Sequence, residues 1–234
     1  MISIVIPTYN ERTNITPLLR EIVMLYPSAT IIVVDDSSRD GTLDEVKKLQ
    51  KKYSQIHLLI RKNEKGRGGA CIAGFQYILK NFPKTSYILE MDSDFSHAPG
   101  DIRKLISAAK PDTIIIGSRY TSGSRIIDWP KYRLFLSMLA NWYIRFFLNV
   151  PIRDYTMGFR CYSNKALQSI DFKKIKYKGF ITLSETAYVL KQKGFRFKEV
   201  PITLKDRTRG KSHANLQEVL KSFIAVLDIR LRPY

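Results

Sequence analysis

The sequence predicts an α/β protein, a single domain in which helices flank a mainly parallel central sheet. Short apolar runs rich in β-branched residues alternate with helical stretches through the first half of the chain. No internal repeat or low-complexity linker divides its 234 residues. Alternation of this kind implies crossover connections, which place helices on the faces of a parallel sheet. A chain of this length is long enough to bury a substantial core.

Strands are expected at residues 2–6, 30–34, 56–60, 86–91 and 113–117. Helical spacing or composition predicts helices near residues 11–25, 41–52, 67–80, 99–109 and 131–149. The character of the chain changes after about residue 120, where residues 121–124 are expected to form a loop. We therefore expect one domain with a basic C-terminal portion.

Positive charge is concentrated in the second half of the chain. The net charge is +18, of which residues 1–100 contribute only +2 and residues 101–234 contribute +16. Lysines on a solvated surface account for part of this excess. The asymmetry nevertheless indicates an anionic partner, which could be a phosphate, an acidic membrane surface or a nucleic acid.

Cysteine usage and hydropathy indicate the compartment. Cys71 and Cys161 lie far apart without a metal-ligand spacing, which favours neither a disulfide framework nor a zinc site and fits the reducing cytoplasm. The chain begins at once with strand-like residues, so no secretion signal is expected. No apolar run reaches the roughly 18 residues of a spanning helix. Contact with a membrane is therefore expected to be peripheral, at the cytoplasmic face.

Polar or acidic residues follow four consecutive predicted strands. Asp92 and Asp94 lie one residue apart after the apolar segment 87–91, and Asp35 and Asp36 follow the second strand. An acidic pair alone is weak evidence, because such triplets often only cap a helix. Carboxyl ends of parallel strands share one edge of a sheet, where nucleotides and hard divalent cations are commonly bound. The coincidence predicts a metal-dependent nucleotide site.

A glycine cluster opens the helix after the third strand, in residues 65–70. Glycine permits close backbone approach, and Lys65 and Arg67 add positive charge that suits a pyrophosphate. The cluster lacks the spacing of the P-loop and of the dinucleotide fingerprint, so neither motif applies.

In their order along the chain, these motifs resemble the family-2 glycosyltransferases, and within them the polyprenyl-phosphate glycosyltransferases such as the dolichol-phosphate mannose synthases. The matching segments are residues 6–11, 34–42, 65–70, 91–97, 117–120, 154–160, 199–202 and 206–212. The resemblance runs from residue 2 to about residue 213. It implies a GT-A fold, a nucleotide sugar donor, Mg²⁺ or Mn²⁺, and an inverting transfer to a lipid phosphate.

The resemblance also assigns residues to the donor and the metal. The donor-binding residues would be Pro7, Tyr9, Glu11, Asp35 and Asp36. Lys65, already noted for its charge, is expected near the diphosphate, and Asp92 is counted with the donor site as well as with the metal. The metal would be held by Asp92 and Asp94, and Ser96 occupies the position of a third ligand, for which serine is a weak choice. Asp94 is the acidic residue on which turnover should depend most.

The acceptor phosphate is expected among residues of the basic half. The resemblance selects Arg119, Arg133, Ser137 and Arg207, and Lys211 carries a basic role that relatives place slightly later in the chain. The planar fork of arginine suits phosphate oxygens. A phosphate monoester has a second pKa of about 6 and is largely dianionic at neutral pH, so this acceptor needs no general base.

Several alternatives remain open from the sequence. GDP-mannose and dolichyl phosphate are favoured only through the resemblance. UDP-glucose is an alternative donor. A hydroxyl of a glycan or protein is an alternative acceptor, for which Glu185 would act as the general base. A basic nucleic-acid-binding protein explains the charge but not the acidic strand ends, so no nucleic acid is expected.

The helix at 131–149 is either buried or membrane-facing. We expect a catalytic domain at 1–213 and an amphipathic helix at 214–234, in the same unit or on a membrane surface.

Overall fold

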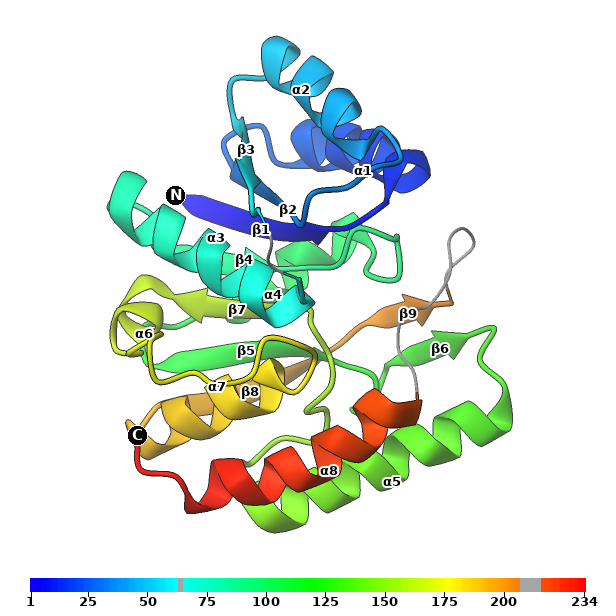
Figure 1. The fold of residues 1–234 in the computed structure, drawn as a ribbon, viewed down its shortest axis with the longest axis vertical. Helices are drawn as coiled ribbons and strands as arrows, with labels where there is room; N and C mark the ends of the chain where they lie inside the picture. Colours follow the sequence, from blue (N-terminus) through cyan, green and yellow to red (C-terminus); the bar gives the residue numbers. More distant parts are fainter. Residues whose placement is uncertain (63–64, 207–215) are drawn as a thin grey trace.

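A seven-stranded sheet forms the centre of the computed structural model, which describes residues 1–62, 65–206 and 216–234 (Figure 1). Its strand order is β3-β2-β1-β4-β7-β5-β8. The strands are β1 Ile2–Thr8, β2 Thr30–Asp35, β3 Ile56–Ile60, β4 Tyr87–Glu90, β5 Thr113–Ser118, β7 Arg160–Ser163 and β8 Arg196–Pro201. A separate pair joins β6 Arg125–Ile127 to β9 Thr203–Lys205. The α/β class predicted from the sequence is confirmed.

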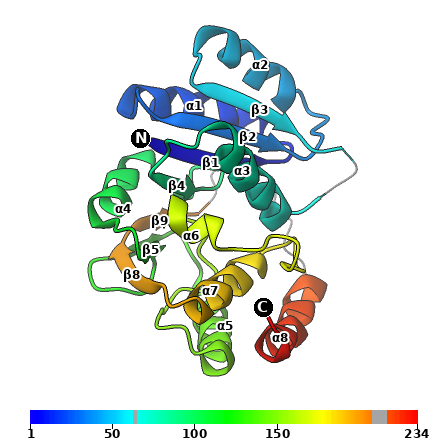
Figure 2. The same cartoon turned by 90° about the vertical axis from the view of Figure 1, so that its left-hand side faces the viewer.

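Helices cover both faces of the sheet (Figure 2). They are α1 Arg12–Leu25, α2 Thr42–Lys52, α3 Arg67–Asn81, α4 Ile102–Ala108, α5 Lys131–Leu148, α6 Asn164–Gln168, α7 Thr182–Gln192 and α8 Leu216–Leu231, with a short 3₁₀ turn η1 at Pro99–Asp101. Helix α1 packs against α2 and η1, and α4 packs against η1, β5 and β8. Helix α3 packs against β1, β2, α6 and α7.

The central strands are buried on both faces, as expected for a parallel sheet covered by helices. All six residues of β2 and of β5 are buried. The predicted strands and helices of the first half are present, and most of their ends are shifted by no more than two residues. The helix expected from residue 99 opens with the 3₁₀ turn η1, so α4 begins only at Ile102. The strands could be predicted because each is a largely apolar run, which is typical of a buried strand.

One strand departs from the parallel arrangement. Strand β7 lies antiparallel between β4 and β5, although it follows β5 in the chain. Its four residues begin with the fully buried Arg160. Strand β7 was not predicted, because its residues Arg160–Ser163 do not form an apolar run. The guanidinium of Arg160 is satisfied by donating to the carbonyl oxygens of Tyr155, Met157 and Leu183.

The sheet changes its winding direction between β1 and β4. From β1 the chain proceeds outward to β2 and β3 on one side, and then returns to β4 on the other side. The ends of β1 and β2 lie side by side, with Thr8 opposite Asp35. Ligands of open α/β sheets bind at such a switch point, outside the carboxyl ends of the strands. The fold therefore brings the polar ends of β1, β2 and β4 to one place.

Helices α5 and α8 pack against each other beyond the edge of the sheet formed by β5 and β8 (Figure 1). The Tyr143 hydroxyl donates to the carbonyl oxygen of Phe223, and their two rings pack edge to face. Within the described parts of the chain, no helix combines the length and the hydropathy that crossing a bilayer requires.

Candidate active site

A cavity of about 700 Å³ opens at the switch point of the sheet. Most of the residues predicted to bind the donor or the metal line it: Pro7, Tyr9, Glu11, Asp36, Lys65, Asp92 and Asp94. Its walls are the loops after β1 and β2, the start of α3, the loop after β4 and the loop before α7. Acidic side chains from the loops after β2 and β4 thus face a common space, which the start of the glycine cluster also lines.

Asp35 lies beneath this cavity and is fully buried. Its carboxylate accepts hydrogen bonds from the Thr8 hydroxyl at 2.8 Å, and from the amide and hydroxyl of Ser38 at 2.7 Å. Ser37, the second residue of the following loop, has a φ of 57°, which turns the chain sharply. Asp35 therefore ties the end of β1 to the loop after β2 and does not line the cavity.

Asp36 reaches the cavity wall and fixes the glycine cluster. One carboxylate oxygen lies 3.0 Å from the Arg61 guanidinium, and the other accepts from the amide of Gly66 at 2.9 Å. Gly66 has a φ of 120°, and an added Cβ would lie 2.5 Å from the carbonyl oxygen of Lys178. Only glycine permits this close approach. The Lys65 ammonium lies over the Tyr9 ring at 5.1 Å, on the exposed side of the cavity.

The acidic pair is held by its neighbours rather than by the strand alone. Asp92 Oδ1 accepts from Arg67 Nε at 2.6 Å, and the Asp92 amide donates to His97 Nδ1 at 3.1 Å. His97 stacks on Phe159 at 5.0 Å, and burial lowers its pKa, which favours the neutral imidazole. Asp94 Oδ1 accepts from the amide of Ser96 at 3.0 Å. His97 therefore positions the backbone that carries the pair.

The two carboxylates fit a magnesium or manganese ion. Such cations prefer hard oxygen ligands and commonly take one or two protein carboxylates together with water and phosphate oxygens. Among the described residues no group of three or more histidine, cysteine or acidic side chains converges, so Asp92 and Asp94 would hold the ion without a full protein cage. Ser96 offers its amide to Asp94, and it is not among the residues found to line the cavity.

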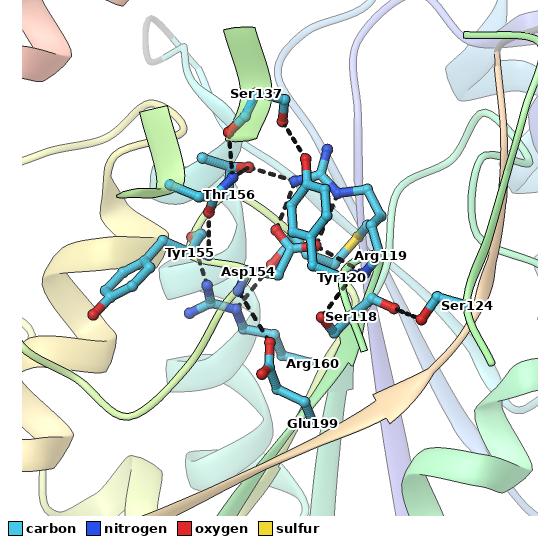
Figure 3. A network of polar contacts seen from close by, with 12 residues as sticks. Ser118, Arg119, Tyr120, Ser124, Ser137, Asp154, Tyr155, Thr156, Arg160 and Glu199 are labelled. Atoms are coloured by element: carbon cyan, nitrogen blue, oxygen red, sulfur yellow. Dashed lines mark hydrogen bonds and ion pairs between the residues drawn. The ribbon is translucent and has the colours of Figure 1, made fainter. Parts of the chain in front are cut away.

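A second polar cluster lies around Arg119, after β5 (Figure 3). Its guanidinium is nearly buried and forms a bidentate ion pair with the fully buried Asp154, at 2.6 and 2.8 Å. It also donates to the Thr156 hydroxyl. The Tyr120 hydroxyl, whose pKa is raised by burial, donates to Ser137 on α5 at 2.7 Å. Tyr120, the neighbour of Arg119 in the chain, therefore connects the predicted acceptor residues Arg119 and Ser137.

Arg133 belongs to the same cluster. Its guanidinium stacks on the Trp129 ring at 4.2 Å, and Arg119 approaches that ring at 5.3 Å. Arg133 also pairs with Asp206 at 2.8 Å and remains about two-fifths exposed. The indole thus holds two arginines near one another, which the sequence analysis did not foresee. A tryptophan four residues before Arg133 was the available signal.

Three consecutive residues connect this cluster with the acidic pair. Thr156 accepts from Arg119, the Met157 sulfur lies 3.1 Å from His97 Nε2, and the Gly158 carbonyl oxygen accepts from Arg67 at 2.9 Å. The buried arginine after β5 and the carboxylates after β4 therefore share a common support. The geometry combines an acidic cavity wall with a neighbouring basic cluster.

Comparison with known proteins identifies the family. Residues 3–175 match the model of glycosyl transferase family 2. The chain belongs to glycosyltransferase family 2. It is 35% identical over 233 residues to the polyprenol monophosphomannose synthase of Mycolicibacterium smegmatis, covering 98% of this chain and 86% of the relative. It is 34% identical over 208 residues to the undecaprenyl-phosphate mannosyltransferase of Micrococcus luteus, covering 89% of this chain and 85% of that relative.

Solved structures confirm the GT-A fold of this family-2 glycosyltransferase. Glucosyl-3-phosphoglycerate synthase from Mycobacterium tuberculosis, in complex with Mn²⁺, UDP and phosphoglyceric acid, matches with a TM-score of 0.69 at 16% identity. That match covers 100% of this chain and 80% of the other. A mannosyltransferase from Pyrobaculum calidifontis, in complex with GDP-Man and Mn²⁺, matches with a TM-score of 0.59 at 15% identity, over 98% of this chain and 72% of that one.

Glu185, the alternative base of this glycosyltransferase, is fully buried on α7. Its carboxylate accepts from the amides of Lys176 and Tyr177 at 3.0 Å, from Arg232 at 3.1 Å and from the Tyr234 hydroxyl at 3.0 Å. A carboxylate used in this way anchors the loop before α7 and the end of α8. That loop includes Gly179 and Phe180, which line the cavity. This wall of the cavity was not predicted, because the loop has no recognisable sequence motif.

Two predicted residues of the enzyme, Arg207 and Lys211, lie outside the described residues. Their roles remain predictions. The described residue nearest to them in the chain is Asp206, which is paired with Arg133.

Proposed function

We propose that this glycosyltransferase transfers mannose from GDP-mannose to a polyprenyl phosphate, with inversion at the anomeric carbon. The proposal rests on two neighbouring clusters of side chains. One is the acidic wall of the cavity, and the other contains Arg119, Arg133 and Ser137. The two relatives, a polyprenol monophosphomannose synthase and an undecaprenyl-phosphate mannosyltransferase, support this choice of sugar and acceptor.

The donor would occupy the cavity. Tyr9, Glu11 and Asp36 line the part next to β1 and β2 and are proposed to hold the nucleoside, while Lys65 approaches the diphosphate. A divalent ion held by Asp92 and Asp94 would offset the charge of the diphosphate as it departs. Mn²⁺ accompanies GDP-Man in a structural neighbour, which supports a divalent metal and GDP-mannose together.

The acceptor requires orientation rather than deprotonation. A phosphate monoester already carries a nucleophilic oxygen at neutral pH, because its second pKa is about 6. Arg133 is the more exposed of the two arginines at Trp129 and is proposed to meet the phosphate. Arg119, bound to Asp154, would hold the surrounding loops and contribute positive potential. Glu185 is buried in contacts with the C-terminal segment, which argues against a role as base.

A donor and acceptor panel tests the proposed function. Purified protein with Mn²⁺ or Mg²⁺ is incubated with labelled GDP-mannose, UDP-glucose or another nucleotide sugar, together with polyprenyl phosphate, and label is followed into the organic extract. We expect GDP-mannose to label the lipid. Labelling only from UDP-glucose would overturn the choice of donor, and absence of any lipid product would overturn the acceptor.

We also propose that α5 and α8 contact the membrane that carries the lipid. Apolar side chains on α5 that are about half exposed or more are Tyr132, Phe135, Leu136, Met138, Leu139, Trp142 and Phe146. Exposed apolar residues on α8 are Ile224, Leu227 and Leu231. In this proposal residues 1–213 are the catalytic domain and residues 214–234 complete the membrane surface. A helix face of this composition suits the interface of a bilayer.

Replacing Phe135, Trp142 and Phe146 by serine tests this surface. Burial of a large apolar side chain contributes roughly 1.5–3 kcal/mol, so we expect the triple variant to bind anionic liposomes at least tenfold more weakly in a sedimentation assay. GDP binding should be unchanged. Met24→Ser on α1, with a side chain that is also largely exposed, is the matched control and should bind normally. Unaltered liposome binding by the triple variant would refute the assignment.

A further inference from the structure

Arg67 is a buried cation in the wall of the donor cavity. It is the first residue of α3 and follows Gly66, and its side chain is only 10% exposed. The guanidinium points to the end of β4, where Nε donates to Asp92 Oδ1 at 2.6 Å and Nη1 to Glu90 Oε2 at 3.0 Å. Nη2 donates to the Gly158 carbonyl oxygen at 2.9 Å. All three nitrogens are therefore engaged.

The surroundings of Arg67 are built to hold it in this position. A Cβ on residue 158 would lie 2.0 Å from Arg67 Nη2, so the guanidinium occupies space that only glycine leaves open. Glu90 is itself buried, and its second carboxylate oxygen accepts from the Tyr162 hydroxyl at 2.7 Å. The Arg67 guanidinium therefore keeps one orientation, because any movement would take it away from the carboxylates of Glu90 and Asp92.

This placement changes the electrostatics of the metal site. Three carboxylates lie along the end of β4, on Glu90, Asp92 and Asp94, and the Arg67 charge cancels one of them. The same guanidinium engages Oδ1 of one proposed metal ligand. A fixed cation beside a metal site opposes a second cation and favours an anion. The acidic pair is thus less attractive to a free divalent ion, and the cavity is more attractive to a diphosphate, than the carboxylates alone imply.

We propose that Arg67 is a positioning residue that makes divalent cation binding depend on the nucleotide diphosphate. It supplies a permanent counter-charge, so that the nucleotide binds measurably without metal while the ion alone binds weakly. The diphosphate then completes the cation site by restoring negative charge. This inference rests on the proposed donor site and adds an order of binding to it.

Arg67→Met and Arg67→Gln test the inference in the full chain. Binding of GDP in the presence of EDTA is measured by calorimetry, and binding of Mn²⁺ alone by electron paramagnetic resonance. We expect neutral variants to bind metal-free GDP at least tenfold more weakly and Mn²⁺ alone several-fold more tightly. Glutamine still offers Asp92 a hydrogen-bond donor, so it separates the charge from the support of Asp92 if methionine impairs folding. Arg67→Lys keeps the charge and should bind both ligands more nearly as the wild type does.

The two ligands distinguish charge from structure. If Arg67 only supports the loop, its loss disorders Asp92 and weakens Mn²⁺ and GDP together, which would overturn the inference. Unchanged affinities would overturn it equally. If the wild-type protein binds no GDP with or without Mn²⁺, the proposed donor site itself is wrong, and the inference falls with it.

Discussion

Asp94→Asn is expected to lower transfer by about 10²–10³-fold or more in the presence of Mn²⁺, because a charge that stabilises the departing diphosphate is lost. Asp94 is almost fully buried and lines the cavity. Asparagine has the same shape and keeps a carbonyl oxygen for the amide of Ser96, so the loop should persist. The rate of label transfer to polyprenyl phosphate measures the effect.

Asp112→Asn is the matched control for Asp94. Asp112 is an exposed acid that lies 3.8 Å from Arg196 at the sheet edge, and its replacement should leave turnover unaltered. Thermal unfolding of both variants shows whether they are folded. An Asp94→Asn protein that transfers sugar at a near-normal rate would contradict a metal role for the pair.

Arg119→Met is expected to lower the free energy of unfolding by about 3–5 kcal/mol, because it leaves Asp154 as a buried charge without its ion-pair partner. Asp154 is fully buried, and the Arg119 side chain is 7% exposed. The same change removes the donor to the Thr156 hydroxyl and one of the two arginines at Trp129. Denaturant unfolding measures the loss, and Arg153→Met, at an exposed position nearby, provides the control.

Combining Arg119→Met with Asp154→Asn separates structure from acceptor binding. The double variant removes both charges, so it should recover part of the lost stability. If Arg119 contacted only the acceptor phosphate, Arg119→Met would be as stable as the wild type and would differ only in the KM for the lipid. That outcome would contradict a supporting role for this arginine.

Much of the fold was predictable because its parallel strands are apolar on both faces. Residues 30–34 and 113–117 contain no face that meets water, and such runs have few other interpretations. Strand β8 was missed because it lies at the sheet edge, and its charged residues alternate with partly buried ones. The sequence does not decide whether α5 is exposed, because an apolar helix can be buried or face a bilayer, and its exposure depends on tertiary packing.

The candidate site was predictable in its donor half and less so elsewhere. The acidic strand ends can be recognised in the sequence, because polar residues directly follow apolar strands. The partner of an arginine, by contrast, depends on segments far apart in the chain. Arg119 was expected to bind phosphate, yet its guanidinium is paired with Asp154, and Arg67 pairs with Asp92 across 25 positions. Such pairs form only in the folded chain, and no local sequence pattern predicts them.

The most direct measurement is a comparison of polyprenyl phosphate with the corresponding polyprenol as acceptors of label from GDP-mannose. The phosphate needs no base, and Arg133, the more exposed arginine at Trp129, is proposed to meet it. We therefore expect label in the organic phase only when the lipid carries a phosphate. Equal labelling of the polyprenol, or labelling of a glycan hydroxyl in place of the lipid phosphate, would contradict transfer to a lipid phosphate.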